Sequence, residues 1–154
     1  DLVHFIIGEG PDEEKLKNLV NDLKLKDKVR FEGRKIKEEL ANYYNIADIF
    51  VLMSRDIDGE VEGLGIVHLE AAYFGKPVIG GKSGGTVDAV EHGKTGYIID
   101  SKNQKELEKK LLLLLKNQKL RQKLGKAGRE RVLKDFLWEQ NVKKVLRLCK
   151  QYGI

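Results

Sequence analysis

The chain has 154 residues, 41% of them hydrophobic, which suits a single domain with one core. Its 29 basic and 24 acidic residues leave a net charge of +5, and both signs are interspersed along predicted helices, which argues against a nucleic-acid-binding protein. The longest purely apolar run, residues 111–115, is far shorter than the roughly 20 residues that span a bilayer. Because Cys149 is the only cysteine, no internal disulfide can form. A cytoplasmic protein is expected, with peripheral contact at the inner membrane face left as an alternative.

Short apolar runs alternate with amphipathic stretches, a pattern typical of a parallel sheet with helices on both faces. The sequence therefore predicts an α/β domain of the Rossmann-like, doubly wound type, compact over residues 1–154. Strands are predicted at residues 2–7, 29–31, 49–53, 77–79 and 97–99. Helices are predicted at residues 12–23, 37–47, about 66–74 and 86–91, with extra C-terminal helices at 104–116, 119–133 and from Trp138 onward. Because residues 2–7 already have the pattern of a buried strand, the domain is expected to be truncated at its N-terminal edge.

In an open parallel sheet, ligands bind at the carboxyl ends of the strands, so the glycine-rich loops that follow strands are the candidate ligand-binding segments. The first such loop, Gly8 to Pro11, lacks the third glycine of a dinucleotide fingerprint, because Glu13 stands at that position. Acidic residues at positions 12–14 would also repel a pyrophosphate at the helix start. This loop is therefore predicted to be a tight turn, and an oxidoreductase is rejected.

The second loop leads into the third predicted helix and consists of Glu62, Gly63, Leu64, Gly65 and Ile66. Its glycines let the backbone approach a ligand, and free N–H groups at a helix start favour an anion. Glu62 lies just before the helix and Glu70 about one turn inside it, so both carboxylates can accept hydrogen bonds from vicinal hydroxyls of a sugar or ribose.

A third loop, residues 80–86, follows the fourth predicted strand. Its glycines, which include Gly84 and Gly85, favour a flexible cradle for a ligand, and Lys82 adds a positive charge. Thr86 is predicted to cap the helix that follows.

The run from Glu62 to Ile79 reads EGLGIVHLEAAYFGKPVI, and it is followed by Ser83-Gly84-Gly85 and by GKTG at residues 93–96. This pattern resembles glycosyltransferase family 4, whose members are retaining enzymes of the GT-B fold with two Rossmann-like domains that face a cleft. Residues 8–11, 29–33 and 47–51 match further blocks of the family in the same order, so the likeness covers nearly the whole chain. The segment 54–62 with its Gly-Leu-Gly is similar to GDP-mannose-dependent phosphatidylinositol mannosyltransferases.

The resemblance implies that the chain is the donor-binding half of a hexosyltransferase acting on a lipid or glycan acceptor. GDP-mannose is the favoured donor and a UDP-sugar the alternative, with no cofactor and no metal ion. Glu62 would be the catalytic position beside the transferred sugar, and Glu70 would bind the donor ribose. The backbone of residues 63–66 would meet sugar hydroxyls and the diphosphate. The residues implied to hold the base are Gly33, Arg34, Lys35 and Ile36.

The chain departs from the family pattern in two respects. An Arg and a Lys that grip the diphosphate in the family precede the strand with which this chain begins, and Asp88 stands where Glu is more usual. The acceptor-binding N-terminal domain is also expected to lie outside the chain, so the chain alone is predicted to be inactive. The alternatives are a non-catalytic nucleotide-sugar-binding or interaction module and one half of a nucleotide-sugar epimerase.

Other conspicuous side chains are interpreted as structural. His68 lies two positions before Glu70 on the same predicted helix and points to a different side, so a packing or surface position is expected. The histidines are separated and lack acidic partners at ligand spacing, so no metal site is predicted. Tyr43, Tyr44 and Trp138 are expected in the core or at a domain interface.

Overall fold

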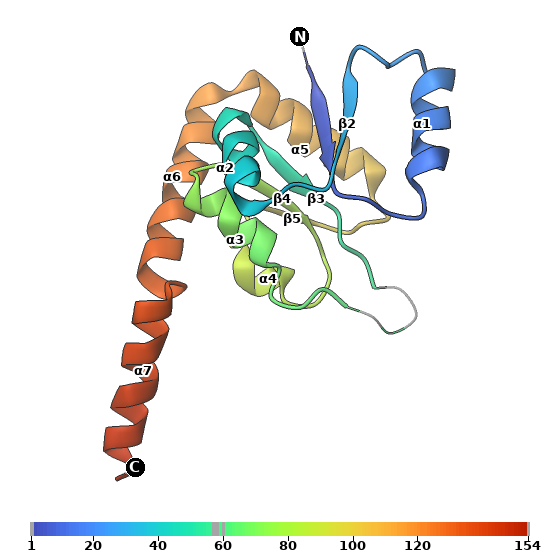
Figure 1. Ribbon diagram of the computed structural model, residues 1–154. Coiled ribbons are helices and arrows are strands. Elements are labelled where there is room, and N and C mark those ends of the chain that lie inside the picture. Colours follow the sequence, from blue (N-terminus) through green and yellow to red (C-terminus); the bar gives the residue numbers. More distant parts are fainter. Residues whose placement is uncertain (1, 57–58, 60, 154) are drawn as a thin grey trace. The chain divides into compact units, whose positions relative to one another are not determined.

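The computed structural model describes residues 2–56, 59 and 61–153 (Figure 1). Contacts divide the chain into two compact units, Asp1–Tyr43 and Tyr44–Ile154, where the sequence pattern predicts one. Each unit is built from parallel strands that alternate with helices. The boundary between the units falls inside helix α2 (Lys37–Ile46), so Tyr43 belongs to unit 1 and Tyr44 to unit 2.

Unit 1 is a parallel pair of strands with a crossover helix. Its elements are β1 (His4–Ile7), α1 (Glu13–Asp22), β2 (Val29–Gly33) and the first part of α2. The chain leaves β1 at Gly8, whose φ of 119° is rarely adopted by other residues, and the Gly8 N–H donates to the Gly33 carbonyl at 2.9 Å. The first glycine-rich loop is therefore a strand-to-helix turn, as predicted.

Unit 2 contains a three-stranded parallel sheet and most of the helices (Figure 1). Its strands are β3 (Phe50–Leu52), β4 (Val78–Gly81) and β5 (Gly96–Ile99), paired in that order. Its helices are α3 (Ile66–Tyr73), α4 (Thr86–Ala89), α5 (Gln104–Lys116), α6 (Gln118–Asp135) and α7 (Trp138–Gln151).

The predicted α/β class with parallel strands is confirmed, and each predicted strand and helix is present, most of them with slightly shifted ends. The strands nevertheless form two sheets, β1-β2 and β3-β4-β5, rather than the single sheet that the pattern suggests. The reason is that side-chain periodicity reports which faces are buried, whereas backbone hydrogen bonds decide which strands pair.

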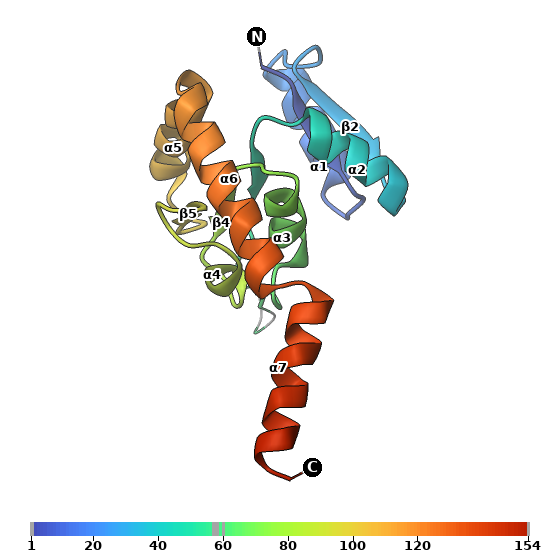
Figure 2. The same cartoon turned by 90° about the vertical axis from the view of Figure 1, so that its left-hand side faces the viewer.

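Different helices cover the two faces of the β3-β4-β5 sheet (Figure 2). Because side chains alternate along a strand, Ile79 faces one side, where it packs with Leu114 of α5 and Leu124 of α6. Phe50 faces the other side and meets the His68 ring of α3 edge-on, with 5.7 Å between ring centroids. The core of unit 2 therefore has helices on both sides of its sheet, as in a doubly wound fold.

The short helix α4 begins at Thr86, as predicted, but its cap residue and its end differ from the prediction. Gly85 occupies the N-cap position, so Thr86 lies inside the helix and its side chain makes no capping hydrogen bond. The Thr86 hydroxyl is buried and has no hydrogen-bond partner among the described residues. The helix ends at Ala89 rather than at residue 91, because Val90 has an extended backbone with φ −121° and ψ 118°.

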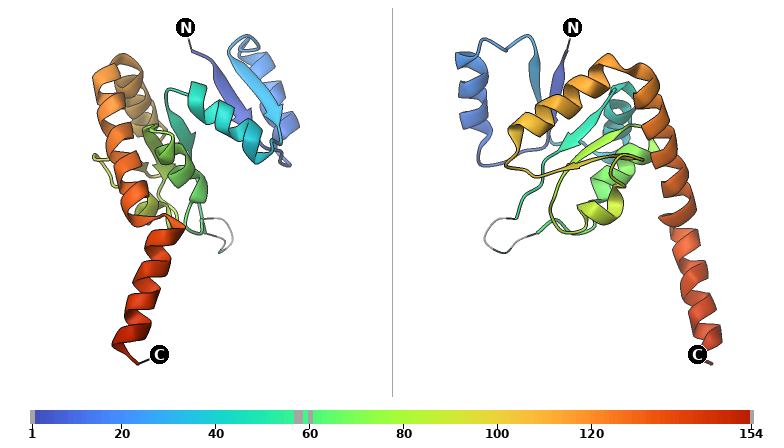
Figure 3. Two further views of the ribbon diagram at one scale, coloured as in Figure 1. Left: turned by 60° about the vertical axis from the view of Figure 1, so that its left-hand side comes forward. Right: turned by 180° about the vertical axis from the view of Figure 1, so that it is seen from behind.

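The last helix, α7, runs beyond the packed part of unit 2 (Figure 3). Trp138 at its start is 81% exposed, so of the two positions predicted for this residue the core is wrong, and the domain interface stays a prediction. The physical reason is that α7 continues past the end of α6 and does not return to the sheet. In the described part of the chain, no helix combines the length and the apolar character that crossing a membrane requires.

Candidate functional site

The candidate site lies at the start of α3, where the loop after β3 enters the helix. Gly65 is the N-cap residue and has a left-handed backbone, with φ 70° and ψ 49°. A Cβ atom at this position would lie 2.7 Å from His68 Nδ1, so glycine is required for two reasons. The first turn carries no acidic residue, and the N–H groups of Leu64 and Ile66 donate to no acceptor in the described chain. A helix start of this kind favours an anion.

Glu62 precedes this helix start and is held by hydroxyl groups. Ser54 Oγ donates a hydrogen bond to Glu62 Oε2 at 2.8 Å, and the Glu62 N–H donates to Ser83 Oγ at 3.1 Å. The Ser83 hydroxyl donates in turn to Asp56 Oδ1 at 2.5 Å. The loops after β3 and β4 therefore position this residue together. Ser54 is a partner that the sequence did not predict, although a hydroxyl directly after a strand end was an available signal.

Gly84 and Gly85 were predicted to contact substrate, and the structure places them directly against the Glu62 loop. The Gly85 N–H donates to the carbonyl oxygens of Glu62 and Gly63, at 3.0 and 2.7 Å. A Cβ atom would lie 1.9 Å from the Glu62 carbonyl oxygen if placed on Gly84, and 2.0 Å from the Gly63 carbonyl oxygen if placed on Gly85. Both glycines are therefore needed for the two loops to meet, and their contact with a substrate stays a prediction.

Glu70 lies one turn inside α3 and is half-buried. Its Oε2 atom accepts a hydrogen bond from the Tyr44 hydroxyl at 2.9 Å. Tyr44 itself is buried, which confirms its predicted place in the core. The site thus combines N–H groups suited to an anion with two carboxylates, Glu62 and Glu70, suited to hydroxyl groups.

The segment predicted to hold the base follows β2 in unit 1. Gly33 begins it with a left-handed φ of 64°. Lys35 Nζ lies 3.8 Å from Glu32 Oε2, which also accepts a hydrogen bond from the Tyr43 hydroxyl at 2.6 Å. This hydrogen bond raises the pKa of Tyr43. Contact of the segment with a base stays a prediction. The exposed residues of the segment are Arg34 and Ile36.

His68 is fully buried on the sheet side of α3. Its Nδ1 lies 3.3 Å from the Gly65 carbonyl oxygen, and its Nε2 lies 3.5 Å from the carbonyl oxygen of Leu52 in β3. Burial lowers the pKa of the imidazole. A packing role, one of the two predicted from the sequence, is confirmed, and this packing connects the N-cap of α3 to the end of β3.

The free energy of unfolding is expected to fall as the pH drops below 6.5, the ordinary pKa of histidine. Because the folded-state pKa of His68 is lower than this value, the unfolded chain binds more protons in that pH window, and acidification destabilises the fold. Urea unfolding between about pH 5 and pH 8 measures the effect. His68→Gln should show a weaker pH dependence than the wild type. Burial also lowers the pKa of His4, so this residue contributes part of the pH dependence in both proteins. An equally steep dependence in the variant would contradict the role of His68.

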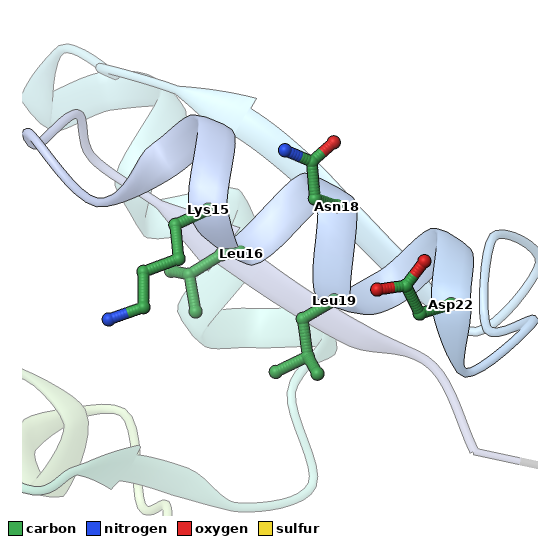
Figure 4. A pocket seen from close by; sticks show the side chains of 5 residues that line it. All are labelled: Lys15, Leu16, Asn18, Leu19 and Asp22. Carbon is green, nitrogen blue, oxygen red and sulfur yellow. The ribbon is translucent and has the colours of Figure 1, made fainter.

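Away from this loop, two of the surface hollows in the described part of the chain can be compared with it. The hollow in unit 2 beside α4 includes Glu91, which is already paired with Arg131 at 2.8 Å and with Lys94 at 3.2 Å. Neither hollow includes Glu62 or Glu70, and we assign no ligand to them. The hollow in unit 1 is a shallow surface of α1 alone (Figure 4), lined by Lys15, Leu16, Asn18, Leu19 and Asp22.

Parallel strands that alternate with helices define a Rossmann-like fold, in which ligands bind at the carboxyl ends of the strands, and here Glu62 and the start of α3 follow the carboxyl end of β3. The fold and the sequence of the chain identify the family to which it belongs. The chain is a member of the glycosyl transferases group 1 family, whose model matches residues 1–131.

Individual relatives agree with this assignment. The GDP-mannose-dependent alpha-(1-6)-phosphatidylinositol monomannoside mannosyltransferase of Mycobacterium tuberculosis is 38% identical over 136 residues, which are 87% of this chain and 35% of that relative. Sucrose-phosphate synthase from Thermosynechococcus elongatus has a similar structure, with a TM-score of 0.79 and 29% identity over 97% of this chain and 38% of its own. The C-terminal domain of a glycosyl transferase group 1 family protein from Francisella tularensis has a TM-score of 0.78 and 27% identity over 88% of this chain and 70% of its own. The predicted resemblance to glycosyltransferases is therefore confirmed.

Proposed function

We propose that the full-length protein transfers a hexose from a nucleotide diphosphate sugar to an acceptor with retention of configuration, and that this chain is its donor-binding half. The observation that carries the proposal is the start of α3, where N–H groups that donate to no acceptor among the described residues lie between Glu62 and Glu70. A nucleotide diphosphate sugar has the matching groups, because its diphosphate suits the helix start and its sugar and ribose hydroxyls suit the carboxylates. Membership of the family supports the same ligand.

Each group at the site has a role in this proposal. The diphosphate lies at the N–H groups of residues 64–66, Glu62 faces the transferred sugar as the catalytic carboxylate, and Glu70 accepts hydrogen bonds from the ribose. Negative charge builds up on the diphosphate as its bond to the sugar breaks, and the fixed N–H groups of the helix start stabilise that charge. The hydrogen bond from Ser54 holds the Glu62 carboxylate in place.

GDP-mannose is the donor that we favour, because the Mycobacterium tuberculosis relative is GDP-mannose-dependent. That relative is also a phosphatidylinositol monomannoside mannosyltransferase, which supports a lipid acceptor rather than a glycan acceptor. A UDP-sugar is the alternative donor. The guanine or uracil base is proposed to lie against Gly33 to Ile36.

No cofactor is proposed, and donor binding is proposed to need no metal ion. The α3 start supplies the partial positive charge that a cation would otherwise provide to the diphosphate. Among residues 2–56, 59 and 61–153, no group of three or more His, Cys, Asp and Glu side chains is arranged to hold a metal ion. Donor affinity should be the same with and without a chelator, and weaker binding after chelation would contradict this part of the proposal.

The test of the proposed function is sugar transfer by the full-length protein. Labelled GDP-mannose and UDP-glucose are each supplied with phosphatidylinositol-based acceptors, and the anomeric configuration of the product is determined by NMR. Transfer with retention is expected from one of the donors. Binding without turnover would favour a non-catalytic module, and interconversion of the nucleotide sugar without an acceptor would favour an epimerase. The chain alone should transfer nothing, because orientation in a complete site is worth about 7 to 11 kcal/mol of the barrier.

We also propose that this domain works beside an N-terminal acceptor-binding domain of the same protein, in the cytoplasm and in peripheral contact with the inner membrane face. The chain spans 35% of the mycobacterial relative, which leaves room for that domain.

Helix α7 supports the membrane contact because it exposes Trp138 and carries basic residues on the opposite face. Sedimentation with phosphatidylinositol vesicles tests the contact. Trp138→Ser should reduce the fraction of protein that sediments with the vesicles. If the wild-type protein does not bind the vesicles, the proposed membrane contact is wrong. The basic residues are Lys143, Lys144, Arg147 and Lys150.

A further inference from the structure

We propose that Tyr44 is a positioning residue for the donor site, because its hydroxyl fixes the Glu70 carboxylate in the orientation that meets the ribose. This inference rests on the proposed function and extends it to a residue that itself touches no substrate. Its basis is the 2.9 Å hydrogen bond from the Tyr44 hydroxyl to Glu70 Oε2, which joins the last turn of α2 to the middle of α3 within unit 2.

The surroundings of Tyr44 hold its ring in one position. The ring stacks on Phe74, with 5.3 Å between centroids and 18° between planes, and it lies 5.9 Å from the Phe50 ring. Only 9% of the residue is exposed. Phe74 is the C-cap residue of α3, so the same helix that carries Glu70 also packs against the ring that holds its carboxylate. The hydroxyl is therefore a fixed point from which the Glu70 side chain is oriented.

The chemistry of a phenol suits this task. Burial raises the pKa of Tyr44 far above its usual value, so at neutral pH the hydroxyl keeps its proton and donates to the carboxylate. A hydrogen bond to a carboxylate is stronger than one between neutral groups. Unlike a lysine or an arginine, the phenol adds no positive charge beside Glu70. Because the phenol occupies Oε2, the carboxylate presents Oε1 to the ribose hydroxyls.

Tyr44→Phe removes the hydroxyl and keeps the ring that packs on Phe74. Using the full-length protein, calorimetry compares the affinity for GDP or UDP, whichever the wild type binds more tightly, with the affinity for its 2′,3′-dideoxy analogue. The variant should bind the ribonucleotide about fivefold to tenfold more weakly, which corresponds to the loss of one hydrogen bond. Its affinity for the dideoxy analogue should stay the same. The ratio of the two affinities is the decisive quantity, since partial unfolding would lower both equally.

The matched control is Tyr97→Phe, which removes a hydroxyl from another buried tyrosine, 7% exposed, in β5. This control should leave the ratio unchanged. In a Glu70→Gln background, adding Tyr44→Phe should have little further effect on the ratio, because Tyr44 acts through Glu70. The inference is overturned if Tyr44→Phe weakens both nucleotides equally, or if its effect is as large without the Glu70 carboxylate. If Glu70→Gln alone leaves ribonucleotide affinity unchanged, the proposed role of Glu70 fails instead.

Discussion

Glu70→Gln is expected to weaken the binding of GDP or UDP by roughly tenfold or more, because charge-assisted hydrogen bonds are worth about 1.5 to 3 kcal/mol each. The carboxylate lies one turn inside α3, beyond the N–H groups at the helix start, where it can reach past a diphosphate to adjacent ribose hydroxyls. Inorganic pyrophosphate has no such hydroxyls, so its affinity should stay the same or increase when the negative charge is removed. Calorimetry on the full-length protein measures both ligands.

Glu108→Gln is the control for this change. Glu108 is an exposed residue of α5 and does not belong to the α3 loop, so its substitution removes the same charge without touching the site. Nucleotide affinity should stay at the wild-type value. If Glu70→Gln and Glu108→Gln give the same affinities, the assignment of Glu70 to the ribose is wrong.

Gly125→Ala is expected to destabilise the chain by about 2 kcal/mol, although alanine is the better helix former by roughly 1 kcal/mol. Gly125 lies in α6, and a Cβ atom there would come within 1.8 Å of the Gly75 carbonyl oxygen and 2.7 Å of the Gly75 carbonyl carbon. Both are backbone atoms that cannot rotate away, so α6 would have to move from the turn that follows α3. Overpacking of this kind costs up to about 3 kcal/mol, which exceeds the gain in helix propensity. Thermal unfolding should show a lower Tm, by about 4 to 8 °C.

The same helix supplies a comparison. At Gly128 a Cβ atom would lie 3.3 Å from the Ala72 Cβ, a side-chain atom, and no closer contact is found there. Gly128→Ala should therefore change the Tm by much less than Gly125→Ala. Equal effects at the two positions would show that helix packing at Gly125 does not depend on the close backbone contact.

The elements were predictable because each depends on local spacing. Helix α5 was predicted at its observed ends, residues 104–116, and its first turn is capped by Asn103, whose side chain accepts a hydrogen bond from the Glu106 N–H. Strands β4 and β5 were found from short apolar runs between glycines and charged residues. Periodicity could not distinguish one sheet from two, because it contains no information about pairing partners.

The candidate site was predictable where the motif is continuous in sequence. Glu62, the glycines and Glu70 lie within one short segment, and the resemblance to glycosyltransferases assigned roles to all of them. Their supporting contacts were not predictable, since Tyr44 is 26 positions from Glu70 and Ser83 is 21 positions from Glu62. Nothing in local spacing indicates which distant hydroxyl will lie beside which carboxylate.

The sequence by itself determined the alternation of strands and helices, the family, and the carboxylates at the start of α3, because these follow from side-chain order along a single segment. Only the tertiary structure decided how strands pair, why Gly84, Gly85 and Gly125 cannot carry side chains, and which hydroxyls hold Glu62 and Glu70. These features arise where segments far apart in the chain come within van der Waals or hydrogen-bond distance. The short range of those interactions, a few ångströms, is why they can be decided only after the chain has folded.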